Sequence, residues 1–376
     1  MAIKDLGYVS TRASFNIWLS RDCSEWNAVA FVTFKKPVSS HHIGSPPVKS
    51  NTAAPTKDGS MKSRNTKNVS RKIQYGSVHS KCCHPGFYNK GNTCYANSIL
   101  QAISAFPDLW SQGISNRLNP SSLTRSISSV MSQMQRSSST IDPSNFLRVL
   151  QSTISNTKPN FQYNTQHDVT EVLEIVLAEL TGPSNLARDL ISLTICYTKT
   201  CNECYFSYKT YETQTILVLS VGKSVQSSLD SFLKEEELGG ANKWFCPICE
   251  KLCDASLETC ISSCSQFLVV QLRRFSYSNN VFKKDNSFVQ CLPSTDSSNP
   301  EFLTIPAIVE EDVSLYNGYS LMATINHSGT MEKGHYWAYI KQKNHSWLLC
   351  NDKLVSEAKP SALNNKSVYI LFYERR

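Results

Sequence analysis

The chain has 376 residues, 40% of them hydrophobic, and it carries 14 cysteines and a formal net charge of +8. This length and apolar fraction suffice for one large core or two smaller ones. The longest apolar runs are only strand-length, so we expect neither a membrane protein nor a secreted one. A long chain of this kind favours reduced thiols and metal ligands over a disulfide scaffold, which indicates the cytoplasm, the nucleus or both.

The first part of the chain divides into two segments. Residues 1–34 contain scattered aromatic and β-branched positions, and we assign them no function. Residues 35–82 are rich in Ser, Thr, Asn, Pro and Lys, and their ten basic residues and single acid give a net charge of +9. The rest of the chain is therefore close to neutral. This composition predicts a disordered linker. Attraction to nucleic acid is the alternative, and the scattered lysines and single aromatic residue disfavour it.

A turn-rich stretch from Gly86 to Gln101 delivers Cys94 to the start of a predicted helix, which ends before Pro107. Unpaired N–H groups and the positive end of the helix dipole lower the pKa of a thiol at that position, and the thiolate is the nucleophilic form. An inert, buried cysteine is the alternative. The chemical interpretation of Cys94 therefore depends on finding a base elsewhere in the chain.

A stronger helical pattern follows, with an apolar stripe at helical spacing from Val169 to Leu180. The residues just before it predict a helix start in which Thr165 is the N-cap. Asp168 then lies three residues further on, where a carboxylate interacts favourably with the helix dipole.

Two Cys-x-x-Cys pairs stand about forty residues apart on either side of an alternating segment, 213–220, which predicts a strand. Two such pairs supply four thiolates, which close a tetrahedral zinc site and make it structural. Unrelated reduced cysteines are the alternative, and three further cysteines nearby leave the ligand choice open. No zinc role in catalysis is expected. The predicted ligands are Cys201, Cys204, Cys246 and Cys249.

A candidate base lies about 240 residues after Cys94. His335 begins an aromatic and β-branched run, so we expect it on the first residues of a strand. A second short strand ends at Asn351 and Asp352, and a polar turn joining the two strands would bring Asn351 beside His335. This is the nucleophile, base and orienter arrangement of a cysteine protease.

The segments around Cys94 and His335, together with the Asn351-Asp352 pair, resemble the cysteine and histidine boxes of ubiquitin-specific proteases. The Leu-Arg-Arg-Phe stretch ending at Phe275 and the Leu-Phe-Tyr ending at Tyr373 are also similar to that family. The resemblance implies an α+β, papain-like cysteine protease fold with a helical thumb, a β palm and zinc-ribbon β fingers. Residues 83–376 would form this catalytic domain, with the fingers at about 195–262.

The resemblance also implies an activity, which is thiol-dependent hydrolysis of the isopeptide or peptide bond after the C-terminal glycine of ubiquitin. Its partners would be ubiquitin and ubiquitinated proteins, and the enzyme would be a monomer. Cys94 would attack, His335 would be the base and Asn351 its orienter. Asn89 would help form the oxyanion hole, and Asp352 would be a second orienter or a support for the oxyanion region.

Substrate contacts are implied as well. Gln166 and Asp168 would face the channel that receives the arginine-bearing tail of ubiquitin, which is compatible with their helix-start role. His327 and Tyr336 complete the predicted substrate-binding set, with His327 expected in a loop that flanks the cleft next to Gly329.

Three other functions stay open at this point. A non-catalytic ubiquitin-binding scaffold would have no need to keep Cys94, His335, Asn89 and Asn351 together. A protease for another ubiquitin-like modifier is disfavoured, though not excluded, by Asp168, which suits a basic tail. A zinc-bearing nucleic-acid module is disfavoured by the nearly neutral body, so no nucleic-acid partner is expected.

Overall fold

The computed structural model describes residues 84–115, 120–182, 189–278, 281–292, 302–309, 313–330 and 333–376. All of these residues belong to one compact unit, 75–376. The predicted segments 1–34 and 35–82 lie outside the described residues, as does residue 83 at the start of the predicted catalytic domain. Within the described ranges, no helix combines the length and apolar character that crossing a bilayer requires.

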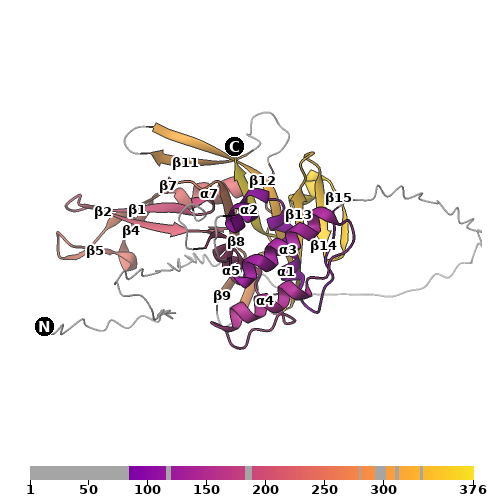
Figure 1. The fold of residues 1–376 in the computed structure, drawn as a ribbon. Helices are drawn as coiled ribbons and strands as arrows, with labels where there is room; N and C mark the ends of the chain where they lie inside the picture. The colour runs from indigo at the N-terminus through magenta and orange to yellow at the C-terminus, as the bar shows by residue number, and fades with distance from the viewer. Residues whose placement is uncertain are drawn as a thin grey trace, which may run out of the picture. The chain divides into compact units, whose positions relative to one another are not determined.

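A group of helices forms the N-terminal third of this unit and lies together in Figure 1. They are α1 (Cys94–Ser104), α2 (Pro107–Ser115), α3 (Ser122–Arg136), α4 (Ser144–Ser155) and α5 (Val169–Thr181). In α1, every residue from Cys94 to Ile103 is buried, as expected for a helix that is covered on all sides. The helix α1 is therefore the central element of the group, and it packs directly against strand β13.

The start of α5 differs from the prediction. Its N-cap is Asp168, whose carboxylate accepts the N–H of Thr170 at 2.8 Å. Thr165 lies in the preceding turn, where its hydroxyl donates to the carbonyl of Gln162. The physical reason is that Asp168 has the extended backbone of an N-cap residue and a carboxylate that reaches an unpaired N–H, so the later residue caps the helix.

The strands form one large mixed sheet and two small hairpins. The main path runs β15-β14-β13-β12-β11-β7-β1-β2, while β16 pairs with β12 and β8, β3 pairs with β8, and β4 pairs with β7. Its strands are β1 (Leu193–Cys201), β2 (Ser207–Gln214), β3 (Leu217–Ser220), β4 (Glu236–Leu238), β7 (Ala255–Ser263), β8 (Phe267–Arg273), β11 (Leu303–Val309), β12 (Val313–Gly329), β13 (Gly334–Lys341), β14 (Trp347–Asn351), β15 (Leu354–Ala358) and β16 (Val368–Arg375). The hairpins are β5 (Trp244–Cys246) with β6 (Lys251–Cys253), and β9 (Phe275–Ser278) with β10 (Val281–Lys284).

The predicted strand over 213–220 is divided in two. Strand β2 ends at Gln214 and pairs with β1, whereas β3 begins at Leu217 and pairs with β8. The chain bends between them because it changes partner strand. Strands β1, β2, β4 and β5 extend together away from the helices (Figure 1), and they form the fingers of the predicted architecture.

Two buried apolar clusters hold the unit together. The first joins the helices to the inner faces of β12, β13 and β16, and the second lies between α7 (Val225–Leu233) and strands β3, β8 and β16. Strand β16 contributes to both clusters, and its residues from Val368 to Tyr373 are all buried. This continuous apolar run is typical of a strand that is covered on both faces.

Candidate active site

Cys94 is the first residue of α1, and its side chain is only 4% exposed. The side chain of the N-cap residue Thr93 makes no hydrogen bond to the helix. The N–H groups of the first turn of α1 are therefore not capped by that side chain. This end of the helix carries a positive partial charge, which favours an anionic sulfur. The local structure thus places the thiol where the sequence predicted it.

His335 contacts Cys94 on one side and Asn351 on the other. Its Nε2 atom lies 2.7 Å from the Oδ1 atom of Asn351, and its side chain also hydrogen-bonds Cys94. An amide oxygen only accepts, so Nε2 carries a proton and Nδ1 is the ring nitrogen left for the thiol. The predicted pairing of β13 with β14 is confirmed, with Ala338 opposite Cys350, and it brings Asn351 beside His335. Cys94 reaches the imidazole because α1 packs against β13.

The electrostatics of this contact favour the charged imidazole. The hydrogen bond with Cys94 raises the pKa of His335 to about 9, and burial opposes this effect. The hydrogen bond with Asn351 and the nearby charge of Asp352 also raise it. A raised histidine pKa beside a thiol at a helix N-terminus is the environment in which a cysteine reacts as a thiolate.

A second hydrogen-bonded group lies next to this pair. The Asp352 carboxylate accepts from the Nδ2 atoms of Asn89, at 3.0 Å, and of Asn97, at 2.8 Å. The Oδ1 atom of Asn89 accepts the N–H groups of Gly91 and Thr93, each at 3.1 Å. These contacts fix the plane of the Asn89 amide, so Asp352 supports Asn89 while Asn351 is the residue that contacts His335.

Gln166 and Asp168 contact the protein itself. The Gln166 amide bonds to both backbone groups of Gly334, accepting from its N–H at 2.9 Å and donating to its carbonyl at 3.1 Å. Asp168 accepts the N–H of Thr170 on one oxygen and the hydroxyl of Tyr369 on the other, at 3.0 Å. Their predicted contact with a substrate tail stays a prediction.

The expected loop around His327 is wrong. His327 lies inside strand β12, which continues to Gly329, and the side chain is 2% exposed. Its ring packs against Phe275 and Tyr336, and burial, followed by the charges of Lys284 and His335, lowers its pKa to about 4. The strand continues through this region because β13 pairs with it as far as Gly329. The neighbouring Tyr336 is also buried.

Two residues of the site were missed in the sequence. Asn97 stands three residues after Cys94, so helical spacing alone could have placed it on the same side of α1. Lys284 donates to the Nδ1 atom of His327 at 3.0 Å and to its carbonyl at 2.8 Å. It comes from hairpin β9–β10, and no sequence pattern links that hairpin to β12.

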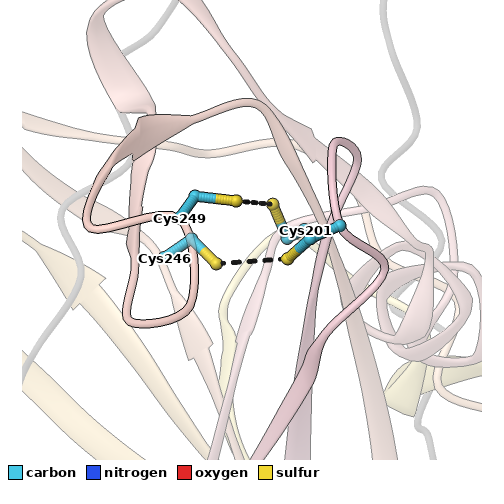
Figure 2. Close-up of side chains that lie close together, drawn as sticks. Cys201, Cys246 and Cys249 are labelled. Carbon is cyan, nitrogen blue, oxygen red and sulfur yellow. Dashed lines mark hydrogen bonds between the residues drawn. The ribbon is translucent and has the colours of Figure 1, made fainter.

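The four predicted metal ligands meet at the tip of the fingers. Cys201 ends β1, Cys204 follows in the turn, Cys246 ends β5, and Cys249 lies in the turn before β6. Figure 2 shows Cys246 and Cys249 on the hairpin facing Cys201, with dashed lines joining sulfur atoms across the gap. All four sulfur atoms lie within 4.8 Å of one another.

The sulfur spacing tests whether zinc fits. Tetrahedral coordination with Zn–S bonds of about 2.3 Å requires sulfur atoms about 3.8 Å apart. The Cys201–Cys249 and Cys204–Cys246 sulfur pairs are 3.9 and 3.6 Å apart. Cys253 belongs to a second, mixed group with Glu203 and Cys249, which lacks a fourth ligand. The four-cysteine set therefore fits an ion with closed tetrahedral coordination.

Comparisons with known proteins agree with this geometry. A family model described as ubiquitin carboxyl-terminal hydrolase matches residues 85–373. The chain is 26% identical over 310 residues to human ubiquitin carboxyl-terminal hydrolase 42, which covers 77% of this chain and 23% of the relative. It is 27% identical over 321 residues to the probable ubiquitin carboxyl-terminal hydrolase 16 of Schizosaccharomyces pombe, which covers 78% of this chain and 67% of the relative.

Solved structures share the fold. The structure of the SAGA Ubp8/Sgf11/Sus1/Sgf73 DUB module bound to ubiquitin aldehyde matches with a TM-score of 0.64 and 22% identity, over 80% of this chain and 71% of that one. This likeness confirms the predicted α+β architecture with helical thumb, β palm and fingers. The chain spans only about a quarter of the human relative's length.

Proposed function

Because the chain belongs to the ubiquitin carboxyl-terminal hydrolase family, we propose that it is a deubiquitinase that hydrolyses the isopeptide or peptide bond after the C-terminal glycine of ubiquitin. The observation that carries the proposal is the hydrogen-bonded series Cys94, His335, Asn351 at the start of α1. Nucleophile, base and orienter within hydrogen-bond reach are the requirement for covalent acyl transfer.

In the first half of the reaction, the Cys94 sulfur attacks the glycine carbonyl carbon and a tetrahedral oxyanion forms. His335, which has taken the thiol proton, then donates it to the leaving lysine amine as the C–N bond breaks. The product is a thioester with Cys94. The raised pKa of His335 supports this step, because the imidazolium must be available as the acid.

In the second half, His335 accepts a proton from a water molecule that attacks the thioester carbonyl. The C–S bond then breaks, and Cys94 leaves as the thiolate beside the imidazolium. We propose that Asn89 donates to the oxyanion in both halves. Its amide nitrogen donates one hydrogen to Asp352, which leaves a second hydrogen on the same atom. A single oxyanion donor typically contributes about 3 kcal/mol of transition-state stabilisation.

We propose that Cys201, Cys204, Cys246 and Cys249 hold one structural zinc ion. The ion would tie the turn after β1 to hairpin β5–β6 and would take no part in the reaction. The backbone N–H of Cys204 lowers the pKa of Cys201 to about 6, whereas the contact with Cys204 raises the pKa of Cys249. A bound zinc ion would favour the thiolate form of all four ligands.

We also propose that the enzyme acts as a monomer on ubiquitinated proteins, in the cytoplasm, the nucleus or both. A nucleophilic thiol and four ligand thiols must stay reduced to work, and a reducing compartment provides that condition.

The test is covalent capture by ubiquitin that carries a cysteine-reactive group at its C-terminus, read by intact mass. We expect one ubiquitin adduct on the wild-type chain, none on Cys94→Ser, and an unchanged adduct on the control Cys260→Ser, whose thiol lies in β7 of the fingers. An adduct only with another modifier would replace ubiquitin as the substrate. No adduct with any modifier would contradict the catalytic proposal.

A further inference from the structure

The first residues of β13, the strand that carries His335, have no backbone pairing with β14. Strand β12 pairs with β13 from its first residue, with Gly329 opposite Gly334. On the other edge, β14 pairs only with residues 338–341. The backbone of the first residues of β13 therefore has no ladder pairs with β14, and the contact of His335 with that strand is the side-chain hydrogen bond to Asn351.

Gln166 supplies such contacts at the first residue of β13. Its side-chain amide accepts from the N–H of Gly334 and donates to the carbonyl of the same residue. This two-bond pattern is the one that a neighbouring strand makes with an opposite residue in a hydrogen-bonded antiparallel pair. The side chain thus replaces a strand at the edge that β14 leaves uncovered, one residue before His335.

His327 supports Gly334 from another direction. A Cβ atom added to Gly334 would overlap the Nε2 atom of His327 and would lie 2.7 Å from the carbonyl of Ser328. Only glycine allows the backbone to approach this closely. Gly334 is therefore held between the Gln166 amide and the buried His327 ring.

Lys284 fixes the His327 ring in turn. Its ammonium group donates to the Nδ1 atom and to the carbonyl of His327. An ammonium group can only donate, so Nδ1 is the acceptor and the ring proton lies on Nε2, toward Gly334. The backbone just before His335 is consequently held on two sides, by Gln166 and by the His327 ring, and neither side chain contacts the Cys94 thiol.

We propose that Gln166 is a positioning residue for His335, acting through the backbone of Gly334, and that it is not primarily a contact for the substrate tail. The inference rests on the proposed function only in that Cys94 and His335 are the reacting pair. Because positioning errors near 1 Å can cost about 100-fold in rate, loss of the two Gln166–Gly334 hydrogen bonds should lower turnover.

The two roles predict different kinetics with a fluorogenic ubiquitin substrate. A positioning role predicts that Gln166→Ala lowers kcat about 10- to 100-fold while KM changes less than about 2-fold. Gln166→Glu should fall between Gln166→Ala and the wild type, since it can still accept from the Gly334 N–H but cannot donate to the carbonyl. A tail-binding role predicts a higher KM with unchanged kcat.

Alkylation of Cys94 by iodoacetamide gives a second readout that needs no modifier. Positioning predicts that Gln166→Ala slows alkylation near neutral pH and moves its pH profile upward, because the imidazole no longer stabilises the thiolate. Gln133→Ala, which removes an exposed glutamine side chain from α3, should match the wild type.

Unchanged alkylation in Gln166→Ala, with melting temperatures equal to the wild type, would overturn the positioning role. The same measurement remains valid if ubiquitin is not the modifier, because it depends only on Cys94 and His335. A wrong positioning role for Gln166 can therefore be distinguished from a wrong choice of ubiquitin as the substrate.

Discussion

Replacing Asn351 by alanine should make His335, the proposed base, less basic. In the wild type, Asn351 accepts from the Nε2–H of His335 at 2.7 Å, and this contact helps to raise the pKa of His335 to about 9. Removing the acceptor destabilises the imidazolium more than the neutral ring. The basic limb of the kcat/KM profile, where His335 loses the proton that it gives to the leaving amine, should therefore move to lower pH.

The size of the shift follows from the hydrogen bond. A hydrogen bond to a charged group contributes about 1.5–3 kcal/mol, and about 1.4 kcal/mol corresponds to one pKa unit. His335 is partly exposed, so solvent screens the interaction and roughly half of it remains. We expect the basic limb to fall by about one unit, with kcat about 10- to 100-fold lower because the ring also loses its orienter.

The raised pKa of His335 also makes the stability of the fold depend on pH. The folded-state value of about 9 exceeds the ordinary 6.5, so His335 contributes stability that is fully present below pH 6.5 and is lost as the pH rises through about 9. Asn351→Ala should reduce that contribution.

The assay is the pH dependence of kcat/KM with a fluorogenic ubiquitin substrate, checked by iodoacetamide alkylation of Cys94. Asn351→Asp is the opposite perturbation, since a carboxylate raises the pKa of His335 and should move the basic limb upward. Asn344→Ala, in the exposed turn after β13, is the control. A basic limb that stays in place in Asn351→Ala, or moves the same way in both Asn351 variants, would refute the reasoning.

Two further predictions concern the metal and a close backbone approach. Native mass spectrometry should find one zinc ion per wild-type chain and none in Cys246→Ser, which should also melt at a lower temperature; a metal-free wild type in reducing, zinc-containing buffer would contradict this. Gly86→Ala should lower the stability by about 1–3 kcal/mol, because its Cβ would lie 2.6 Å from the backbone of Asp352 and Lys353. A Gly86→Ala variant with the melting temperature and kcat of the wild type would contradict this close contact between Gly86 and the backbone of Asp352 and Lys353.

The residues of the proposed catalytic triad were predictable from local patterns. Cys94 precedes a helical apolar repeat, and His335 and Asn351 lie on two short strands that a polar turn joins. The cysteine pairs were predictable for a similar reason, because two ligands from each short turn give a characteristic spacing. In each case a local element fixes the side chain, so sequence alone carries the information.

Contacts that depend on tertiary pairing were not predictable. The family resemblance led us to expect His327 in a loop that flanks the cleft, but the pairing of β12 with β13 extends the strand through it. The Gln166 bonds reach the backbone of Gly334, and a backbone partner leaves no mark on the residue type at that position. Asp168, and not Thr165, is the N-cap of α5 because its extended backbone and its carboxylate reach the unpaired N–H of Thr170.

The position of β16 has a consequence for synthesis of the chain. This strand, Val368–Arg375, lies between β12 and β8 in the sheet, and it can pair with them only after these residues have left the ribosome. Pairings between such distant segments form late, after a large loss of chain entropy. Cys94 is therefore synthesised long before β16, and the sheet that carries His335 is completed only after β16 has been made and has paired with β12 and β8.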